Sequence, residues 1–178
     1  INPDVFTYYY SSIQIMDEVQ RGIYNIRNNM RNNNFVITGP SYYDKTELAK
    51  MIAKQLADKK IISTNKIARI SGDAFNRVNL EAKAVKLLDG VIIIQNADVI
   101  THEACVKLSN MLDKYADRVV VILESSRSVQ SLFSEDEDIR QFFSSVISLP
   151  PFSVDFMIDY IRTYLADRNM GISQEAEI

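Results

Sequence analysis

Residues 35–46 read FVITGPSYYDKT, a short apolar run that is followed at once by a turn and then by polar residues. The run Phe35–Thr38 is rich in β-branched residues and ends at Gly39-Pro40, which is typical of a buried strand that meets a turn. From Lys45 onward, apolar residues recur at helical spacing. This stretch therefore predicts a buried strand, a tight loop and a helix in direct succession.

The rest of the chain continues this alternation of strands and helices. Further apolar runs of strand length occur at 66–71, 91–94, 119–123 and 146–149, and helical periodicity occurs at 12–31, 45–57, 77–88, 101–115 and 153–168. The two middle runs are apolar on both faces, as in the central strands of a parallel sheet. The sequence thus predicts an α/β fold with three αβα layers around a five-stranded parallel sheet.

The loop fits the phosphate-binding pattern G-x-x-x-x-G-K-[ST] from Gly39 onward, except that Asp44 stands at the second glycine. In a working loop, backbone N–H groups wrap the anion, while the lysine and the hydroxyl, here Lys45 and Thr46, contact phosphate and Mg²⁺. Asp44 removes the backbone freedom of glycine and adds a carboxylate. Two like charges about 4 Å apart repel by roughly 4 kcal/mol at an effective dielectric of about 20. The pattern predicts a loop that is empty of nucleotide, with Lys45 paired instead to a carboxylate, for which Asp44 is a candidate.

The end of the third predicted strand argues against a chance match of this loop. P-loop ATPases end that strand with an aspartate that holds Mg²⁺ and a glutamate that orients the attacking water. Here the strand is followed by Gln95 and Asn96, the neutral counterparts of those two acids. Amides form hydrogen bonds, but they bring no charge to Mg²⁺ and cannot act as a general base. We therefore expect no catalytic residue and no metal ligand at this strand end.

With these motifs the chain resembles the AAA+ ATPases, and most of all the CbxX/CfxQ branch, which includes Rubisco activase-like and sporulation stage V protein K-like proteins. Residues 39–46 match its Walker A motif, residues 89–97 its Walker B motif, and residues 148–153 its entry to the helical lid. The resemblance implies a P-loop NTPase fold with the sheet order 5-1-4-3-2. It also implies an α/β core over residues 1–150 and the first, truncated part of a helical lid over residues 151–178.

The resemblance further implies the roles of individual positions. Phe142 takes the arginine finger position, with only the neighbouring Arg140 retained, and Ser125 or Ser126 lies near the polar sensor. The vestigial Walker A loop for nucleotide binding consists of Gly39, Asp44, Lys45 and Thr46.

The simultaneous loss of the loop glycine, both strand-end acids and the finger predicts a catalytically inactive AAA+ domain, or pseudo-ATPase. Such a domain would be a scaffold or protein-interaction module in a larger protein or AAA+ assembly. Its partners would be other AAA+ domains or adjacent domains of the parent chain, and it would bind no cofactor. The alternative is an ATP-binding AAA+ ATPase or remodelling factor with a rearranged but functional site, which would use ATP and Mg²⁺.

The composition excludes several other classes of protein. The chain has 178 residues with 20 Lys+Arg, 23 Asp+Glu, one cysteine and one histidine. A net charge of −3 gives no overall attraction to nucleic acid, and one cysteine provides no disulfide and no zinc motif. No apolar run approaches the ~20 residues that span a bilayer. Because the sequence opens at Ile1 without a secretory pattern, we expect part of a larger cytoplasmic protein.

Overall fold

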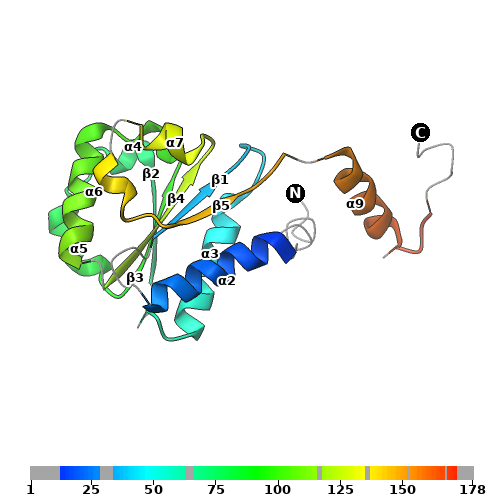
Figure 1. The fold of residues 1–178 in the computed structure, drawn as a ribbon, viewed down its shortest axis with the longest axis horizontal. Helices are drawn as coiled ribbons and strands as arrows, with labels where there is room; N and C mark the ends of the chain where they lie inside the picture. Colours follow the sequence, from blue (N-terminus) through cyan, green and yellow to red (C-terminus); the bar gives the residue numbers. More distant parts are fainter. Residues whose placement is uncertain are drawn as a thin grey trace.

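The computed structural model describes residues 13–28, 34–62, 66–115, 118–134, 137–151, 153–166 and 168–171. In this part of the chain, helices flank a sheet of five parallel strands (Figure 1). The strand order is β2-β3-β4-β1-β5, which is the predicted order 5-1-4-3-2 read from the other edge. The predicted α/β fold with its five-stranded parallel sheet is confirmed.

The five strands coincide closely with the apolar runs of the sequence. They are β1 (Phe35–Thr38), β2 (Ile67–Ser71), β3 (Gly90–Gln95), β4 (Val119–Ser125) and β5 (Ser145–Ser148). The helices are α2 (Ile13–Asn28), α3 (Lys45–Asp58), α4 (Gly72–Phe75), α5 (Leu80–Leu87), the 3-10 helix η2 (Ala97–Val99), α6 (His102–Tyr115), α7 (Val129–Leu132), α8 (Glu137–Arg140) and α9 (Val154–Ala166).

The helix expected at 77–88 differs most from its prediction. The chain forms α4 directly after β2, and α5 begins only at Leu80. The Ser71 hydroxyl accepts a hydrogen bond from the Ala74 N–H at 3.3 Å and so caps α4. This cap starts a helix where the apolar periodicity gives no signal.

Two hydrophobic cores, one on each face of the sheet, hold the helices in place. α2 and α3 cover one face, where Ile37 of β1 packs in a cluster with Ile52 of α3. α4, α5 and α6 cover the other face, where Val36 packs in a cluster with Leu108 of α6. Successive strand residues point to opposite faces, so a strand covered on both sides is apolar at nearly every position.

A buried polar side chain, Asn34, ties three strands together at their amino ends. Its amide donates to the Phe142 carbonyl at 2.9 Å, and its carbonyl accepts from the Val121 N–H at 2.7 Å. Asn34 thereby joins the start of β1 to β4 and to the turn before β5. Both polar groups of its side chain are satisfied, as buried polar groups usually are.

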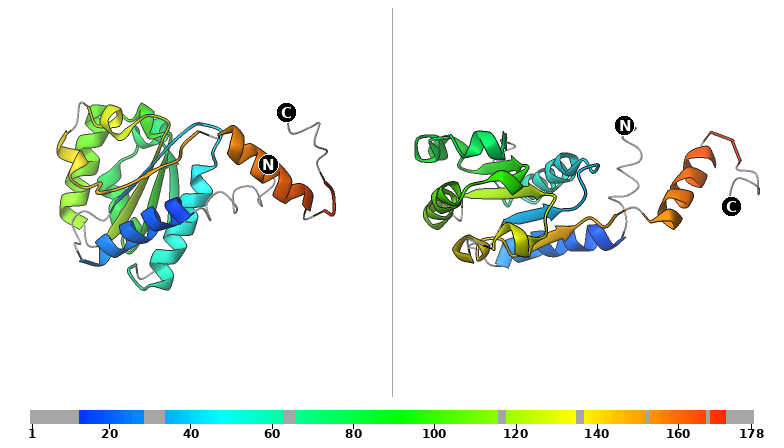
Figure 2. Two further views of the ribbon diagram at one scale, coloured as in Figure 1. Left: turned by 45° about the vertical axis from the view of Figure 1, so that its right-hand side comes forward. Right: turned by 90° about the horizontal axis from the view of Figure 1, so that it is seen from above.

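α9 lies apart from the sheet, on the far side of the segment that follows β5 (Figure 2). Its Val154, Met157 and Ile161 are between 44% and 66% exposed. Residues 172–178 of the predicted lid segment lie outside the described residues, and the domain boundary after residue 150 stays a prediction. No helix in the described ranges has the length and apolar character that crossing a membrane requires.

Candidate functional site

The loop between β1 and α3 turns sharply at Gly39. This residue has a φ of 147°, which L side chains rarely adopt. A Cβ at Gly39 would lie 2.7 Å from the Leu149 Cβ and 2.8 Å from the Leu149 carbonyl oxygen. Only glycine therefore lets the loop lie this close to the end of β5.

The loop then folds around the carbonyl oxygen of Pro40. The Tyr43 N–H donates to this oxygen at 3.2 Å and the Lys45 ammonium donates to it at 2.9 Å. Lys45 is buried, and its burial lowers the pKa of the ammonium, whereas the negative charges of Glu124 and Asp98 act in the opposite direction. The Lys45 ammonium thus has a carbonyl of its own loop as its hydrogen-bond acceptor.

The expected pairing of Lys45 with Asp44 is therefore wrong, and Asp44 caps α3. Its carboxylate accepts from the Glu47 N–H at 3.2 Å. A helix N-terminus favours a carboxylate, because its first N–H groups have no partner within the helix. The φ of Asp44 is −81°, so this backbone position does not require the glycine that Asp44 replaces.

The end of β3 meets the start of α3 at Thr46. The Gln95 side-chain amide donates to the Thr46 hydroxyl at 2.8 Å, and this hydroxyl donates to the Glu124 carboxylate at 3.0 Å. The structure thus brings the hydroxyl of the predicted Walker A loop and the first predicted Walker B position into direct contact. A carboxylate from β4 completes the chain of hydrogen bonds.

Glu124 is a residue of this site that the sequence analysis missed. It is 7% exposed and lies beside Ile37 in the register of β4 with β1. Its Oε2 accepts a hydrogen bond from the Thr46 hydroxyl, while its Oε1 is buried and has no hydrogen-bond partner among the described residues. The sequence does contain a signal for it, because an acid directly follows the apolar run 119–123. That position lies at the carboxyl edge of the sheet, where the loop also lies.

Burial, together with the weaker effect of the negative charge of Asp44, raises the pKa of Glu124 to about 7. The hydrogen bond from Thr46 and the positive charges of Lys45 and Arg69 act in the opposite direction. Burial therefore outweighs the attraction of both cations, and this carboxylate titrates near neutral pH.

Asp98 of η2 binds the loop that follows β4. Its carboxylate accepts from the hydroxyls of Ser125 at 2.7 Å and Ser126 at 2.6 Å, and from the N–H groups of Ser126 at 2.9 Å and Arg127 at 3.2 Å. Partial burial opposes ionisation of Asp98, but these hydrogen bonds outweigh it and lower its pKa. The two serines expected near the polar sensor are thus held by a carboxylate.

The remaining predicted positions lie outside this network of hydrogen bonds. Asn96 follows Gln95 with a left-handed backbone, φ 51° and ψ 54°, and its side chain is exposed. Phe142 is buried in the core that packs against α6. Arg140 is exposed at the end of α8.

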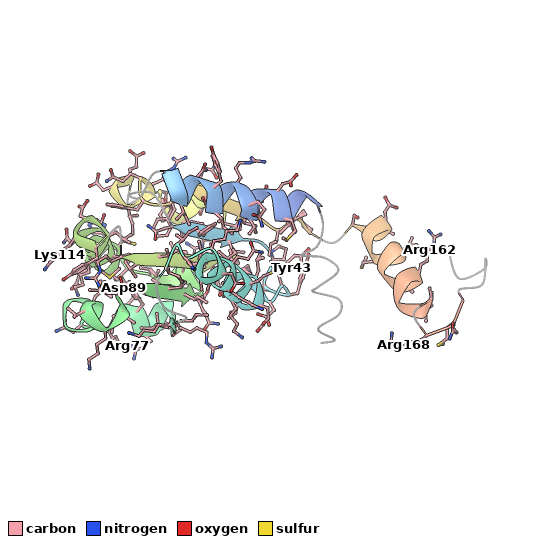
Figure 3. The ribbon with its side chains drawn as sticks, turned by 90° about the horizontal axis from the view of Figure 1, so that it is seen from below. Tyr43, Arg77, Asp89, Lys114, Arg162 and Arg168 are labelled. Carbon is pink, nitrogen blue, oxygen red and sulfur yellow. The ribbon has the colours of Figure 1, made fainter. Side chains whose placement is uncertain are left out.

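Tyr43, a residue of the loop, lies at the end of the α/β body that faces α9 (Figure 3). Tyr43 is buried and donates its hydroxyl to the Pro150 carbonyl at 2.6 Å, while Tyr42 is 49% exposed, with its ring 5.0 Å from the Tyr43 ring. A cavity of about 680 Å³ lies at the opposite end of the body, is lined by Arg77 and Lys114 among others, and includes no residue of the loop.

The known proteins that resemble this chain share its fold but are distant from it in sequence. No family model matches the chain. EccA1, a protein of the ESX-1 secretion system of Mycobacterium leprae, is 27% identical over 160 residues, which are 79% of this chain and 28% of EccA1. The chain thus corresponds to under a third of that relative.

Solved structures with the same fold share little sequence with the chain. RuvB of Thermotoga maritima has a TM-score of 0.65 at 17% identity, with 94% of this chain and 55% of RuvB covered. Domain III of the Thermotoga maritima replication initiation protein DnaA has a TM-score of 0.63 at 18% identity, with coverages of 98% and 79%. PCH-2 of C. elegans has a TM-score of 0.61 at 16% identity, with coverages of 97% and 49%.

At these sequence identities, similarity to the solved structures shows the fold alone. The chain therefore shares its fold with RuvB, DnaA and PCH-2, and its place among the AAA+ ATPases stays a prediction from the sequence motifs.

Proposed function

We propose that this chain is a catalytically inactive AAA+ domain that acts as a scaffold or protein-interaction module. One observation carries the proposal: two donors of the loop already bind oxygen atoms of the chain itself. The Lys45 ammonium binds the Pro40 carbonyl, and the Thr46 hydroxyl binds the Glu124 carboxylate. In an active loop these two groups contact phosphate and Mg²⁺.

The surroundings of Thr46 do not fit the Mg²⁺–nucleotide that the fold family implies. Mg²⁺ binds hard oxygen ligands, chiefly carboxylates and phosphates, but β3 presents the amide N–H of Gln95 to the Thr46 hydroxyl. Phosphate oxygens would meet the buried Glu124, whose Oε1 already lacks a partner among the described residues, and the nearby charge of Asp44. We therefore assign no step of ATP hydrolysis to this chain.

One observation favours a second candidate, an ATP-binding domain with a rearranged site. Glu124 places a carboxylate beside the Thr46 hydroxyl, which the Walker B aspartate normally does, and here β4 supplies it in place of β3. We prefer the inactive domain, because Glu124 and Asp44 both repel phosphate. In addition, the side chain of Phe142 is buried and carries no charge for the site of a neighbouring subunit.

The proposed partners are other AAA+ domains or adjacent domains of the parent protein, in the cytoplasm. Neither nucleic acid nor a bound cofactor belongs to the proposal. AAA+ domains assemble side by side. An inactive copy can therefore have a structural role, because it keeps the surfaces that contact its neighbours although its own nucleotide site does not work. The CbxX/CfxQ branch remains the proposed origin of the domain.

Calorimetric titration with ATP, in the presence and absence of Mg²⁺, tests the proposal. We expect no binding heat up to millimolar ATP, for the wild-type chain and for Lys45→Ala alike. The control is Lys50→Ala, because Lys50 lies on the same helix but is paired with Glu47 at the surface. Micromolar, Mg²⁺-dependent affinity that Lys45→Ala abolishes and Lys50→Ala preserves would overturn the proposal in favour of the second candidate.

A further inference from the structure

We propose that the Glu124 side chain is an internal substitute for an oxyanion, and that removing it converts the loop into a binding site for an inorganic oxyanion of the pyrophosphate class. The carboxylate accepts a hydrogen bond from Thr46 and attracts the Lys45 ammonium electrostatically, and these two groups are the ones that such an anion would use. This inference rests on the proposed function, in which the wild-type loop takes no nucleotide.

The position of Glu124 in the sheet does not call for an acid. All other residues of β4 are apolar except the final serine, and Glu124 lies in register with Ile37. One of its oxygens is buried without a partner among the described residues, which is unfavourable for a carboxylate. The contact that accounts for its orientation is the hydrogen bond from Thr46.

The loop around Glu124 retains the features that attract an anion. The buried Lys45 is electrostatically coupled to Glu124, and α3 directs its N-terminus, with a partial positive charge, toward the loop. If Glu124 were shortened to alanine, Thr46 would lose its acceptor and Lys45 its nearby counter-charge. A small oxyanion supplies both in one molecule, with a compact negative charge and several acceptor oxygens.

Glu124 opposes anion binding more strongly than Asp44 does. Asp44 is exposed, so water and salt screen its charge, and its carboxylate is engaged with the Glu47 N–H. Glu124 is 7% exposed, so above pH 7, where this carboxylate is ionised, its charge acts at short range with little screening. The single change that opens the site is therefore at β4, outside the Walker motifs.

The test titrates inorganic pyrophosphate at pH 8, where Glu124 is ionised, without Mg²⁺ or nucleoside, into the wild-type chain and into Glu124→Ala and Glu124→Gln. We expect Glu124→Ala to bind at least about tenfold more tightly than the wild type, and Glu124→Gln to fall between them, because it removes the charge but keeps the volume. Combining Glu124→Ala with Lys45→Ala should cancel the gain. The control is Glu103→Ala, which removes an exposed carboxylate paired with Lys107 on α6 and should bind like the wild type.

Equal affinities of wild type and Glu124→Ala, with both proteins folded by circular dichroism, would overturn the inference. An equal gain in Glu103→Ala would overturn it as well, because the effect would then be one of net charge. If Glu124→Ala does not fold, the isosteric Glu124→Gln decides by the same comparison. These outcomes are separate from the proposed function, which ATP binding by the wild-type chain alone decides.

Discussion

Two buried polar residues, Asn34 and Glu124, differ in how well the fold satisfies them. Asn34 uses both groups of its amide, on Phe142 and on Val121, so its burial strengthens the sheet. Glu124 uses one oxygen on Thr46, while the other is buried without a partner among the described residues. A group of this second kind lowers stability, and such groups gather at functional or formerly functional sites.

The first prediction concerns the stability of Glu124→Gln as a function of pH. The pKa of Glu124 is raised from its ordinary 4.5 to about 7 in the folded chain. Its protonated form therefore contributes stability that is complete below about pH 4.5 and is lost as the pH rises through 7. Glutamine is neutral at every pH, so it does not lose this stability. The melting temperature of Glu124→Gln minus that of the wild type should therefore increase by about 3 °C or more between pH 5 and pH 8.

Melting curves followed by circular dichroism across this pH range check the prediction. Glu103→Gln is the matched control, because the hydrogen bond from Lys107 lowers the pKa of Glu103 and this carboxylate stays ionised over the whole range. A constant difference between Glu124→Gln and wild type would show that Glu124 does not titrate in this interval.

Among the elements, α3 depends for its stability on its N-cap residue, Asp44. The carboxylate of Asp44 caps the helix through Glu47, and the helix carries Thr46 into the network with Gln95 and Glu124. The aspartate at the glycine position of the predicted phosphate motif thus stabilises the helix. This gives a physical reason why an aspartate can persist at a glycine position.

Asp44→Ala is therefore expected to destabilise the fold by about 1 kcal/mol, the usual cost of losing an N-cap. Asp58→Ala at the other end of α3 is the control, because a negative charge at a helix C-terminus is unfavourable and its loss should be neutral or slightly stabilising. Urea denaturation of both variants measures the difference. Equal effects at the two ends would argue against the cap.

The junction between the loop and β5 gives a third prediction. Gly39→Ala places a Cβ against Leu149 and forces a strained φ, so it should cost about 2 kcal/mol or more. Gly171→Ala is the matched control, since a Cβ there meets nothing within 4 Å. A thermal melt in which both variants match the wild type would mean that the loop does not lie against β5.

For the molecule as a whole, apolar patterning was enough to predict the sheet but not the site. β3 and β4 are buried on both faces, so their apolar runs stand out in the sequence. α4 was missed, because it has four residues and depends on the Ser71 cap in place of a periodic pattern. Glu124 was missed because an acid after an apolar run looks like a solvated strand end. The loop that crosses the carboxyl edge of the sheet buries it, and that arrangement exists only in the folded chain.

Differences in burial between elements predict which backbone amides are most and least protected from hydrogen exchange. β3 lies between β2 and β4 with Val91–Ile94 buried, whereas α9 lies apart from the sheet with three large apolar residues exposed. Amide hydrogen exchange should therefore be slowest in β3 and fastest among the helices in α9. Protection of α9 equal to that of β3 would mean that α9 packs on a partner in solution.

We propose above all that Lys45 and Thr46 bind oxygen atoms of the chain itself in place of a nucleotide, and a crystal structure of the chain grown with millimolar MgADP tests this most directly. We expect an unchanged loop, with the Lys45 ammonium on the Pro40 carbonyl and the Thr46 hydroxyl on the Glu124 carboxylate. Clear density for ADP in the loop, with Lys45 turned onto its phosphates and Glu124 displaced from Thr46, would contradict it.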